Sequence, residues 1–472
     1  MKFVSLIFLY GLLLVVQLSY AFKAAVYEHV RQGDPSKDSA DSIIRKNLLK
    51  YKEATRNASL QGADIIVFPE DGILFFEGSL DHAENIPDPG HVNPCCGPHS
   101  NLSWPILAEL SCLAYDNQIY LVANVIDKKP SVHQNCNNRT KDGHLYYNTN
   151  VAFDRSGTLV SRYHKNHLYR ENRFVPPNPP EYAVFETDFG AKVGMFICSD
   201  VLFKEASALV TRFKVDLAVM STWWFDELPQ WFSVAIQVSW AIRHNVTFLV
   251  SGIQQPSTGN HGSGIYRGVE GPLIYTHSPD WKDKLLVAHV NGPMPQNARY
   301  KDDVLAVDDR VILEQATMGF ATVELEGTWG EETVCKGSYC CSVRFAVPSM
   351  NDTFFLLFKI GYELITEGVT IGVQECMVVR CEAESGRPCR SFPYTSTTTF
   401  TQLELRANFP VPDVFPVLLS DQLALTSMRH WSYHITTENE ALLMINARNP
   451  PPEPLLSAVL LGRIYDNDII HQ

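Results

Sequence analysis

The chain of 472 residues is short of positive charge. It contains 39 Lys and Arg residues against 52 Asp and Glu residues, which gives a formal net charge of -13. Nucleic acids and anionic membrane surfaces require clustered basic side chains, so we expect neither as a partner. The sequence also lacks long low-complexity tracts and short-period repeats, while 45% of its residues are hydrophobic. It is therefore expected to be globular and long enough for two domains.

Long hydrophobic runs are scarce. One follows Lys2, from Phe3 to Val16, and precedes Ser19-Tyr20-Ala21, a small-x-small cleavage pattern. These features are typical of a secretory signal peptide over residues 1–21 rather than of a transmembrane anchor. The run from Leu455 to Leu461 is short and charged residues follow it, so no lipid-anchor signal is expected. We expect a soluble, secreted, extracellular protein without a stable membrane anchor.

Cysteine is present in an odd number, eleven. Cys198 ends an apolar run and is the one that we expect to be unpaired. In an exported protein, the other ten are candidates for disulfides: Cys95, Cys96, Cys112, Cys136, Cys335, Cys340, Cys341, Cys376, Cys381 and Cys389. A zinc site at Cys335/Cys340 and Cys376/Cys381 is disfavoured, because the spacing suits paired ligands poorly and no His companions follow. No metal is expected.

Five Asn-x-Ser/Thr sequons fit a glycosylated protein that is exported from the cell. They begin at Asn57, Asn101, Asn138, Asn245 and Asn351. Asn245 is the weakest of these candidates, because apolar residues follow it.

Strand-like and helix-like patterns alternate over residues 22–305. A first strand at 23–27 precedes a helix that Asp38 or Ser39 can cap and that runs toward Leu60, and a second strand covers 63–68. Further helices are expected at 104–117, 206–213 and 231–243, and further strands at 119–125, 149–153, 158–163, 191–198, 217–220 and 247–252. This order predicts mixed α/β layers in which helices cover a sheet and the site lies at strand ends.

A charged stretch near 296–309 marks the expected domain boundary, which we place after residue 305. Residues 306–472 hold six of the cysteines and short β-rich runs at 354–358, 369–373, 378–379 and 459–461. We expect a smaller β domain there, stapled by disulfides.

Three reactive side chains each end a predicted strand: Glu70, Lys165 and Cys198. A nucleophilic thiol needs a base or a positive neighbour, which Glu70 and Lys165 can supply. Each residue alone has a plainer interpretation, since a single Cys in an apolar strand is more often core than nucleophile. Their combination and chain order favour an enzyme that attacks an amide carbonyl.

These segments resemble the nitrilase superfamily of carbon-nitrogen hydrolases, whose Glu-Lys-Cys triad occurs in this chain order on strand ends. Within that superfamily the chain is most similar to the vanin and biotinidase branch. The resemblance is carried by residues 24–29, 69–71, 86–89, 161–165, 198–203 and 262–266, and in the second domain by 334–341 and 461–465.

The resemblance implies an α/β fold, a four-layer αββα sandwich followed by a smaller β-rich domain. It makes Glu70 the general base and acid, Lys165 the cation that stabilises the oxyanion, and Cys198 the nucleophile. Glu171 resembles a second glutamate that helps to orient the lysine; a salt bridge with Arg170 or Arg173 is the alternative. No cofactor is implied, and the partner is a small-molecule amide.

Ser199 departs from the branch, in which an aromatic residue usually follows the nucleophile. Its backbone N–H remains available as an oxyanion donor, but the lost ring changes the acyl pocket. Trp223, Trp224 and Tyr266 are candidate pocket walls, with core packing as the alternative for one of the tryptophans.

The resemblance favours hydrolysis of pantetheine to pantothenate and cysteamine. Hydrolysis of biocytin or other biotinyl amides is the enzymatic alternative, and a non-catalytic secreted binding protein on the same scaffold is a second. The intact triad argues against the binding protein. A papain-like protease is disfavoured because no cysteine lies in that family's local motif. The oligomeric state stays open.

Overall fold

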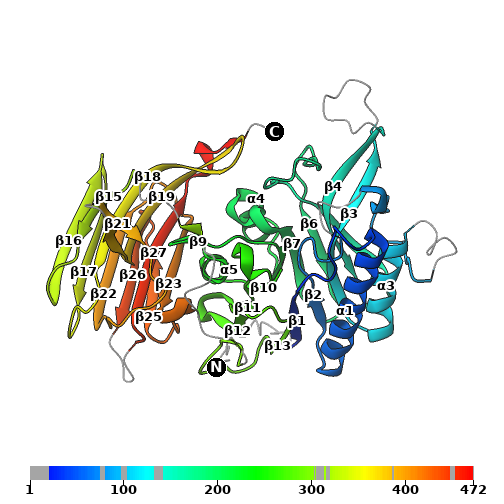
Figure 1. Cartoon of the computed structure of the whole chain (residues 1–472), viewed down its shortest axis with the longest axis horizontal. Helices are drawn as coiled ribbons and strands as arrows, with labels where there is room; N and C mark the ends of the chain where they lie inside the picture. The colour runs from blue at the N-terminus through cyan, green and yellow to red at the C-terminus, as the bar shows by residue number, and fades with distance from the viewer. Residues whose placement is uncertain are drawn as a thin grey trace, which may run out of the picture.

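The computed structural model describes residues 21–74, 80–96, 104–131, 142–301, 303, 313–314, 319–384, 387–446 and 452–470. The expected signal peptide up to residue 20, the sequons at Asn101 and Asn138, and Cys136 lie outside these residues. Figure 1 shows two sheets with flanking helices and, beside them, a pair of further sheets. The α/β sandwich followed by a β-rich region confirms the predicted fold class.

The first sheet has six strands and is covered by two helices. Its order is β13(Lys284–His289), β1(Lys23–Glu28), β2(Ile65–Val67), β3(Tyr120–Pro130), β4(His144–Phe153) and β5(Leu159–His164). Alternate side chains serve opposite faces: Ala25 and Ile66 pack with the helices, whereas Val26 and Val67 face the second sheet. The helices are α1(Ala40–Leu60) and α3(Pro105–Asn117). Ser39 caps α1 as predicted, because its side chain accepts from the Ser42 N–H at 3.3 Å.

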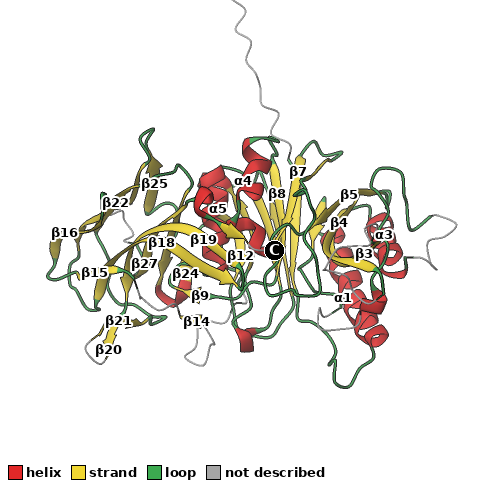
Figure 2. Cartoon of the chain, turned by 90° about the horizontal axis from the view of Figure 1, so that it is seen from above, coloured by secondary structure: helices red, strands yellow, loops and turns green. Residues whose placement is uncertain are grey.

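The second six-stranded sheet packs against the first. Its order is β12(Pro272–Thr276), β11(Ser263–Arg267), β10(Thr247–Gly252), β8(Leu217–Thr222), β7(Lys192–Ile197) and β6(Ala183–Glu186). The helices α4(Lys204–Thr211) and α5(Ser233–His244) cover its outer face, and Figure 2 shows both between this sheet and the β domain. Almost every residue of α5 is buried because the helix is covered on both sides. A short parallel pair joins β9(Glu227–Leu228) to β14(Leu313–Glu314).

The remaining strands form two larger sheets and a hairpin. One sheet has the order β15(Ala321–Glu324), β18(Phe354–Thr366), β19(Val369–Arg380), β27(Leu455–Arg463), β23(Val414–Ser420) and β24(Ala424–Leu425), with β28(Ile469–Ile470) against β19. The other has the order β16(Trp329–Lys336), β17(Tyr339–Ala346), β22(Gln402–Asn408), β26(Glu440–Asn446) and β25(Trp431–Ile435). The hairpin pairs β20(Glu382–Glu384) with β21(Arg387–Ser391).

The β-rich runs at 369–373 and 378–379 belong to one strand, β19, although Gln374 and Glu375 interrupt the apolar pattern between them. Both residues are fully buried. Gln230, from the segment before α5, donates to Glu375 Oε1 at 2.7 Å. A polar residue inside this strand is therefore a contact between the α/β layers and the β domain.

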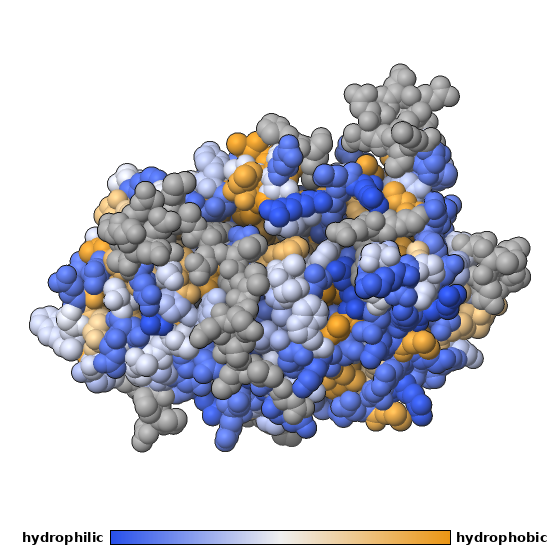
Figure 3. Space-filling view, in the orientation of Figure 1, coloured by the Kyte–Doolittle hydropathy of each residue, from blue (hydrophilic) through white to orange (hydrophobic). Residues whose placement is uncertain are grey.

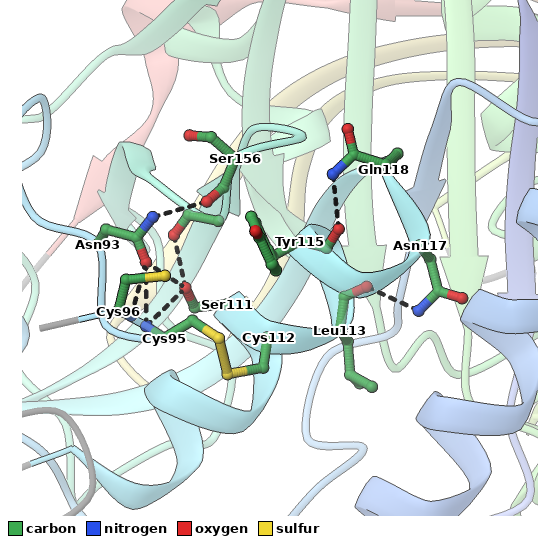
Figure 4. The surroundings of a disulfide bond; sticks show 11 residues. Asn93, Cys95, Cys96, Ser111, Cys112, Leu113, Tyr115, Asn117, Gln118 and Ser156 are labelled. Carbon is green, nitrogen blue, oxygen red and sulfur yellow. Dashed lines mark hydrogen bonds between the residues drawn. A yellow bond between two sulfur atoms is a disulfide. The ribbon is translucent and has the colours of Figure 1, made fainter.

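Four disulfides join described residues: Cys95–Cys112, Cys335–Cys340, Cys341–Cys376 and Cys381–Cys389. Cys341–Cys376 links the two sheets of the β domain, from β17 to β19. Figure 4 shows Cys95–Cys112 fastening the segment before α3 to that helix, with the Cys95 N–H donating to Ser111 Oγ at 3.1 Å. The cysteines that were the alternative zinc ligands are thus disulfide-bonded. Cys96 forms no disulfide with a described residue and is exposed, while Cys198 is buried and free.

On the face that Figure 3 shows, hydrophilic side chains predominate and hydrophobic ones gather in small separate groups. No helix among the described residues is both long and apolar enough to cross a membrane. Three predicted sequons, at Asn57, Asn245 and Asn351, lie at exposed positions.

Candidate active site

The structure brings together the three side chains that the sequence predicts as catalytic. Glu70 follows β2 and Lys165 directly follows β5, both in the first sheet, whereas Cys198 directly follows β7 in the second. All three are buried, with at most 6% of each residue exposed. They line one cavity of about 360 Å³ together. The site therefore lies between the two sheets, at strand ends.

Lys165 is the centre of a buried charge cluster. Its Nζ donates to Glu70 Oε1 at 2.7 Å and to Glu171 Oε1 at 3.1 Å. Although burial works against the charged form, the two carboxylates raise the pKa of Lys165 well above its ordinary value. The side chain is thus an ammonium in the free enzyme.

Glu171 lies where the resemblance implies a second glutamate. Its side chain is buried against Lys165 rather than exposed in a surface ion pair. Burial raises its pKa to about 8, against the lowering effect of Lys165. Charge repulsion from Glu70 adds to the rise. Lys165 thus donates to two glutamates, and burial favours a proton on Glu171.

Asn148 holds the two carboxylates in place, and sequence reasoning missed it. From β4, its Nδ2 donates to Glu70 Oε1 at 2.7 Å and to Glu171 Oε1 at 2.8 Å. Asn124 orients the amide by donating to Asn148 Oδ1 at 2.7 Å. The backbone N–H of Trp223 donates to the other Glu70 oxygen at 3.0 Å. A polar residue inside a strand carries no distinctive sequence signal, so only the pairing of β4 with its neighbours reveals this role.

Cys198 begins a short 3-10 turn, Cys198–Leu202, with a left-handed backbone at φ 47°. A non-glycine residue rarely adopts this conformation, so the surroundings must hold it. Asp200 does so by accepting from the N–H groups of Ile197 at 3.0 Å and His167 at 2.9 Å. At the end of the turn, Arg463 of the β domain donates from Nε to the Leu202 carbonyl at 2.8 Å. The β domain therefore supports the turn that presents the thiol.

The surroundings of the Cys198 sulfur favour the thiol over the thiolate. Burial raises its pKa to about 12, and the Glu70 carboxylate adds to this rise while Lys165 opposes it. Attack by the sulfur therefore requires that a base takes its proton.

Ser199 and Trp224 line a second cavity of about 60 Å³ next to Cys198. The Ser199 hydroxyl donates to the His167 carbonyl at 2.6 Å, and the Trp224 Nε1–H donates to the Trp231 carbonyl at 2.8 Å. Trp223 lines both cavities.

Tyr266 is not brought to either cavity, so the structure corrects its prediction as a wall. The residue is fully buried in β11. Its hydroxyl donates to Gln237 Oε1 of α5 at 2.7 Å. The alternation of the strand directs this ring into the layer between sheet and helix rather than toward the thiol.

Among the described residues, one group has the composition of a metal site: Asp226, His261 and His277, all buried, with ligand atoms within 4.8 Å of one another. Hydrogen bonds already engage both oxygens of Asp226, from His277 Nε2 at 2.8 Å and from the Ser233 N–H at 2.8 Å. We interpret the group as a polar network that fixes the loop after β8.

Comparison with known proteins places the chain in a family. Residues 30–238 match the carbon-nitrogen hydrolase family, and residues 311–468 match the vanin C-terminal domain. The chain is 34% identical to pantetheinase from Canis lupus familiaris over 95% of this chain and 89% of the relative. It is 33% identical to pantetheinase from Mus musculus, over 95% and 90%. With biotinidase from Homo sapiens the identity is 29%, over 95% and 90%.

The fold, the site and these matches define a carbon-nitrogen hydrolase that acts on amides through a cysteine nucleophile. Within that class, the chain belongs to the family of pantetheinases, or vanins, and biotinidases. Among solved structures, an amidase from Nesterenkonia sp. is similar at 21% identity with a TM-score of 0.40, over 57% of this chain and 89% of that chain.

Proposed function

We propose that this chain hydrolyses pantetheine outside the cell, with Cys198 as nucleophile, Glu70 as general base and acid, and Lys165 as the cation at the oxyanion. The observation that carries the proposal is the buried contact of Lys165 with Glu70 beside a cavity that also holds Cys198. Glu171 positions Lys165 and Asn148 positions Glu70, and neither of these two residues needs to touch substrate.

Acylation begins when Glu70 takes the proton of the Cys198 thiol and the sulfur attacks the amide carbonyl carbon. The Lys165 ammonium and the Ser199 N–H then face the negative oxygen of the tetrahedral intermediate. Glu70 passes its proton to the nitrogen as the carbon-nitrogen bond breaks. The amine leaves, and the acyl group remains on Cys198 as a thioester.

Deacylation reverses these roles with water as the nucleophile. Glu70 takes a proton from the water as its oxygen attacks the thioester carbonyl. When the carbon-sulfur bond breaks, Glu70 returns this proton to the Cys198 sulfur, and the carboxylic acid is released. Charge and protons balance in both steps. Glu70 serves as base and then as acid in each step, and Lys165 supplies the cation.

Pantetheine is favoured over biocytin by relatedness. The pantetheinases share 31–34% identity with this chain, whereas the biotinidases share 29–30%. The difference is small, and Ser199 alters the cavity next to the thiol. Biocytin therefore remains the second candidate substrate.

An extracellular location is supported by the four disulfides and by the exposed sequons at Asn57, Asn245 and Asn351. The predicted signal peptide over residues 1–21 and the domains proposed at 22–305 and 306–472 complete this account. Expression in a secretory cell line tests it, since a glycosidase-sensitive product should accumulate in the medium.

The test of the catalytic proposal is turnover by the purified, secreted protein. Pantetheine and biocytin are supplied separately, and pantothenate and biotin are quantified by mass spectrometry. We expect pantothenate release that is lost in Cys198→Ala and retained in Cys96→Ser, which alters an exposed cysteine. Turnover that persists in Cys198→Ala would contradict the proposal, and turnover of biocytin alone would assign the second substrate.

A further inference from the structure

The two cavities that meet at Cys198 differ in their charged lining residues. The smaller cavity, which we call the aromatic chamber, has many aromatic walls, and its charged lining residues are Glu227 and Glu363. Among the described lining residues of this chamber there is no Lys, Arg or His. The larger cavity, which we call the basic chamber, is lined by three basic residues, Lys165, Arg170 and Arg173, and by two acidic ones, Glu70 and Glu171.

One wall of the aromatic chamber comes from the β domain. Glu363, Leu364 and Ile365 lie near the end of β18, and they face the same space as Cys198 and Ser199. Figure 1 shows β18 and β19 reaching from the β domain toward the catalytic layers. Lys359 forms an ion pair with Glu363 along the same strand. This pair anchors the carboxylate of Glu363 at the chamber wall.

The chemistry decides which part of the substrate enters which chamber. Glu70, which must hand a proton to the departing nitrogen, lines the basic chamber and is absent from the lining of the aromatic one. The leaving amine must therefore face the basic chamber. The acyl group, bonded to the other side of the carbonyl carbon, then extends into the aromatic chamber.

We infer that the aromatic chamber receives the acyl chain and selects chains that carry hydrogen-bond donors or a positive charge, with Glu363 excluding chains that end in a carboxylate. The inference rests on the proposed hydrolysis at Cys198. Aromatic faces and carboxylates favour cations and N–H or O–H donors, whereas an added carboxylate is repelled. The hydroxyl groups of a pantothenoyl chain and the ureido N–H groups of a biotinyl chain both meet this requirement.

The test uses four N-acylcysteamines that share their amine and have linear acyl chains of equal length. The chains end in a methyl, hydroxyl, ammonium or carboxylate group, and kcat/KM is measured for each. We expect the carboxylate-ended amide to be hydrolysed at least about tenfold less efficiently than the methyl-ended one, since apposed like charges are costly. The hydroxyl- and ammonium-ended amides should equal or exceed the methyl-ended one.

Glu363→Gln removes the charge and should bring the carboxylate-to-methyl ratio of kcat/KM close to one. The matched control is Glu367→Gln, at an exposed position in the turn between β18 and β19, which should leave the ratio unchanged. If Glu363→Gln does not fold, Glu227→Gln on another wall should shift the ratio in the same direction.

The outcomes separate the inference from the proposed function. If the enzyme hydrolyses neither these amides nor pantetheine nor biocytin, the proposed function fails. If it hydrolyses pantetheine or biocytin but shows no discrimination against the carboxylate, or accepts none of the four amides, the inference about the chamber is overturned while the proposed function stands.

Discussion

The Lys165 ammonium donates to Oε1 of Glu70 at 2.7 Å, with both side chains almost fully buried. This contact joins the proposed base to the proposed oxyanion cation, although 95 residues separate them in the chain. Because both groups come from strand ends of one sheet, their spacing is fixed by the sheet rather than by a mobile loop. The predictions below follow from this arrangement.

Lys165→Met should abolish most of the activity. The variant removes the cation that faces the oxyanion, for which we expect a loss of about 10²–10³-fold in kcat. It also leaves Glu70 and Glu171 buried without their common cation, at a cost of about 3–5 kcal/mol in the free energy of unfolding. Steady-state kinetics and chemical denaturation measure the two effects. Lys52→Met, on the exposed face of α1, is the control, and equal loss in both variants would contradict this role.

Asn148→Ala should lower kcat by about 10–100-fold, because Glu70 loses a hydrogen bond that fixes its position. The effect on KM should be smaller. Removing a donor to the charged form also raises the pKa of Glu171 further above about 8, so the pH profile should shift to higher pH. A loss of activity with an unchanged profile would indicate a structural role alone. Asn408→Ala, at an exposed position of β22, controls for the substitution.

Cys198 should be protonated at neutral pH, since burial raises the pKa of its thiol to about 12. The difference in ultraviolet thiolate absorbance between the wild type and Cys198→Ala should be absent near pH 7 and should emerge only in strongly alkaline buffer. This difference cancels any contribution from Cys96. A thiolate signal at pH 7 that disappears in Cys198→Ala would show a preformed ion pair and contradict the prediction.

Glu375 should make the protein less stable as the pH rises. Burial raises its pKa from 4.5 to about 8, so the folded state binds a proton that the unfolded state releases between these values. Each pH unit in this window lowers the free energy of unfolding by up to about 1.4 kcal/mol. Glu375→Gln keeps the oxygen that accepts from Gln230. It should reduce the fall in the free energy of unfolding between pH 6 and 8 by about 2 kcal/mol.

Denaturation at several pH values measures this slope. Glu367→Gln is the control, since the side chain it alters is exposed and its loss should leave the slope unchanged. A Glu375→Gln variant with the slope of the wild type would show that other buried acids, such as Glu28 with a pKa raised to about 8, dominate the dependence.

Much of the fold follows from local patterns that the sequence displays. Ser39 marks the start of α1 because a capping oxygen serves the first turn whatever the tertiary context. Glu70, Lys165 and Cys198 could be found because each ends an apolar strand, and the structure places them on one cavity.

The features that sequence reasoning missed depend on contacts between distant segments. Asn148 has a role only because β4 lies beside β3 and β5 in the first sheet. Glu363 reaches the cavity only because the β domain docks on the catalytic layers. Tyr266 shows the converse: its sequence neighbourhood indicated a wall, but the alternation of β11 buries the ring behind the sheet. A local sequence pattern encodes neither how the domains dock nor on which face of a sheet a given side chain lies.

The most direct test of the central claim is peptide mass mapping of the purified enzyme, which is acid-quenched during turnover of pantetheine and then digested. We predict a mass increase equal to the pantothenoyl group on the peptide that contains Cys198, removable by hydroxylamine as a thioester should be, and absent from Cys198→Ala. An acyl group found on another residue, or steady turnover by Cys198→Ala, would contradict the account.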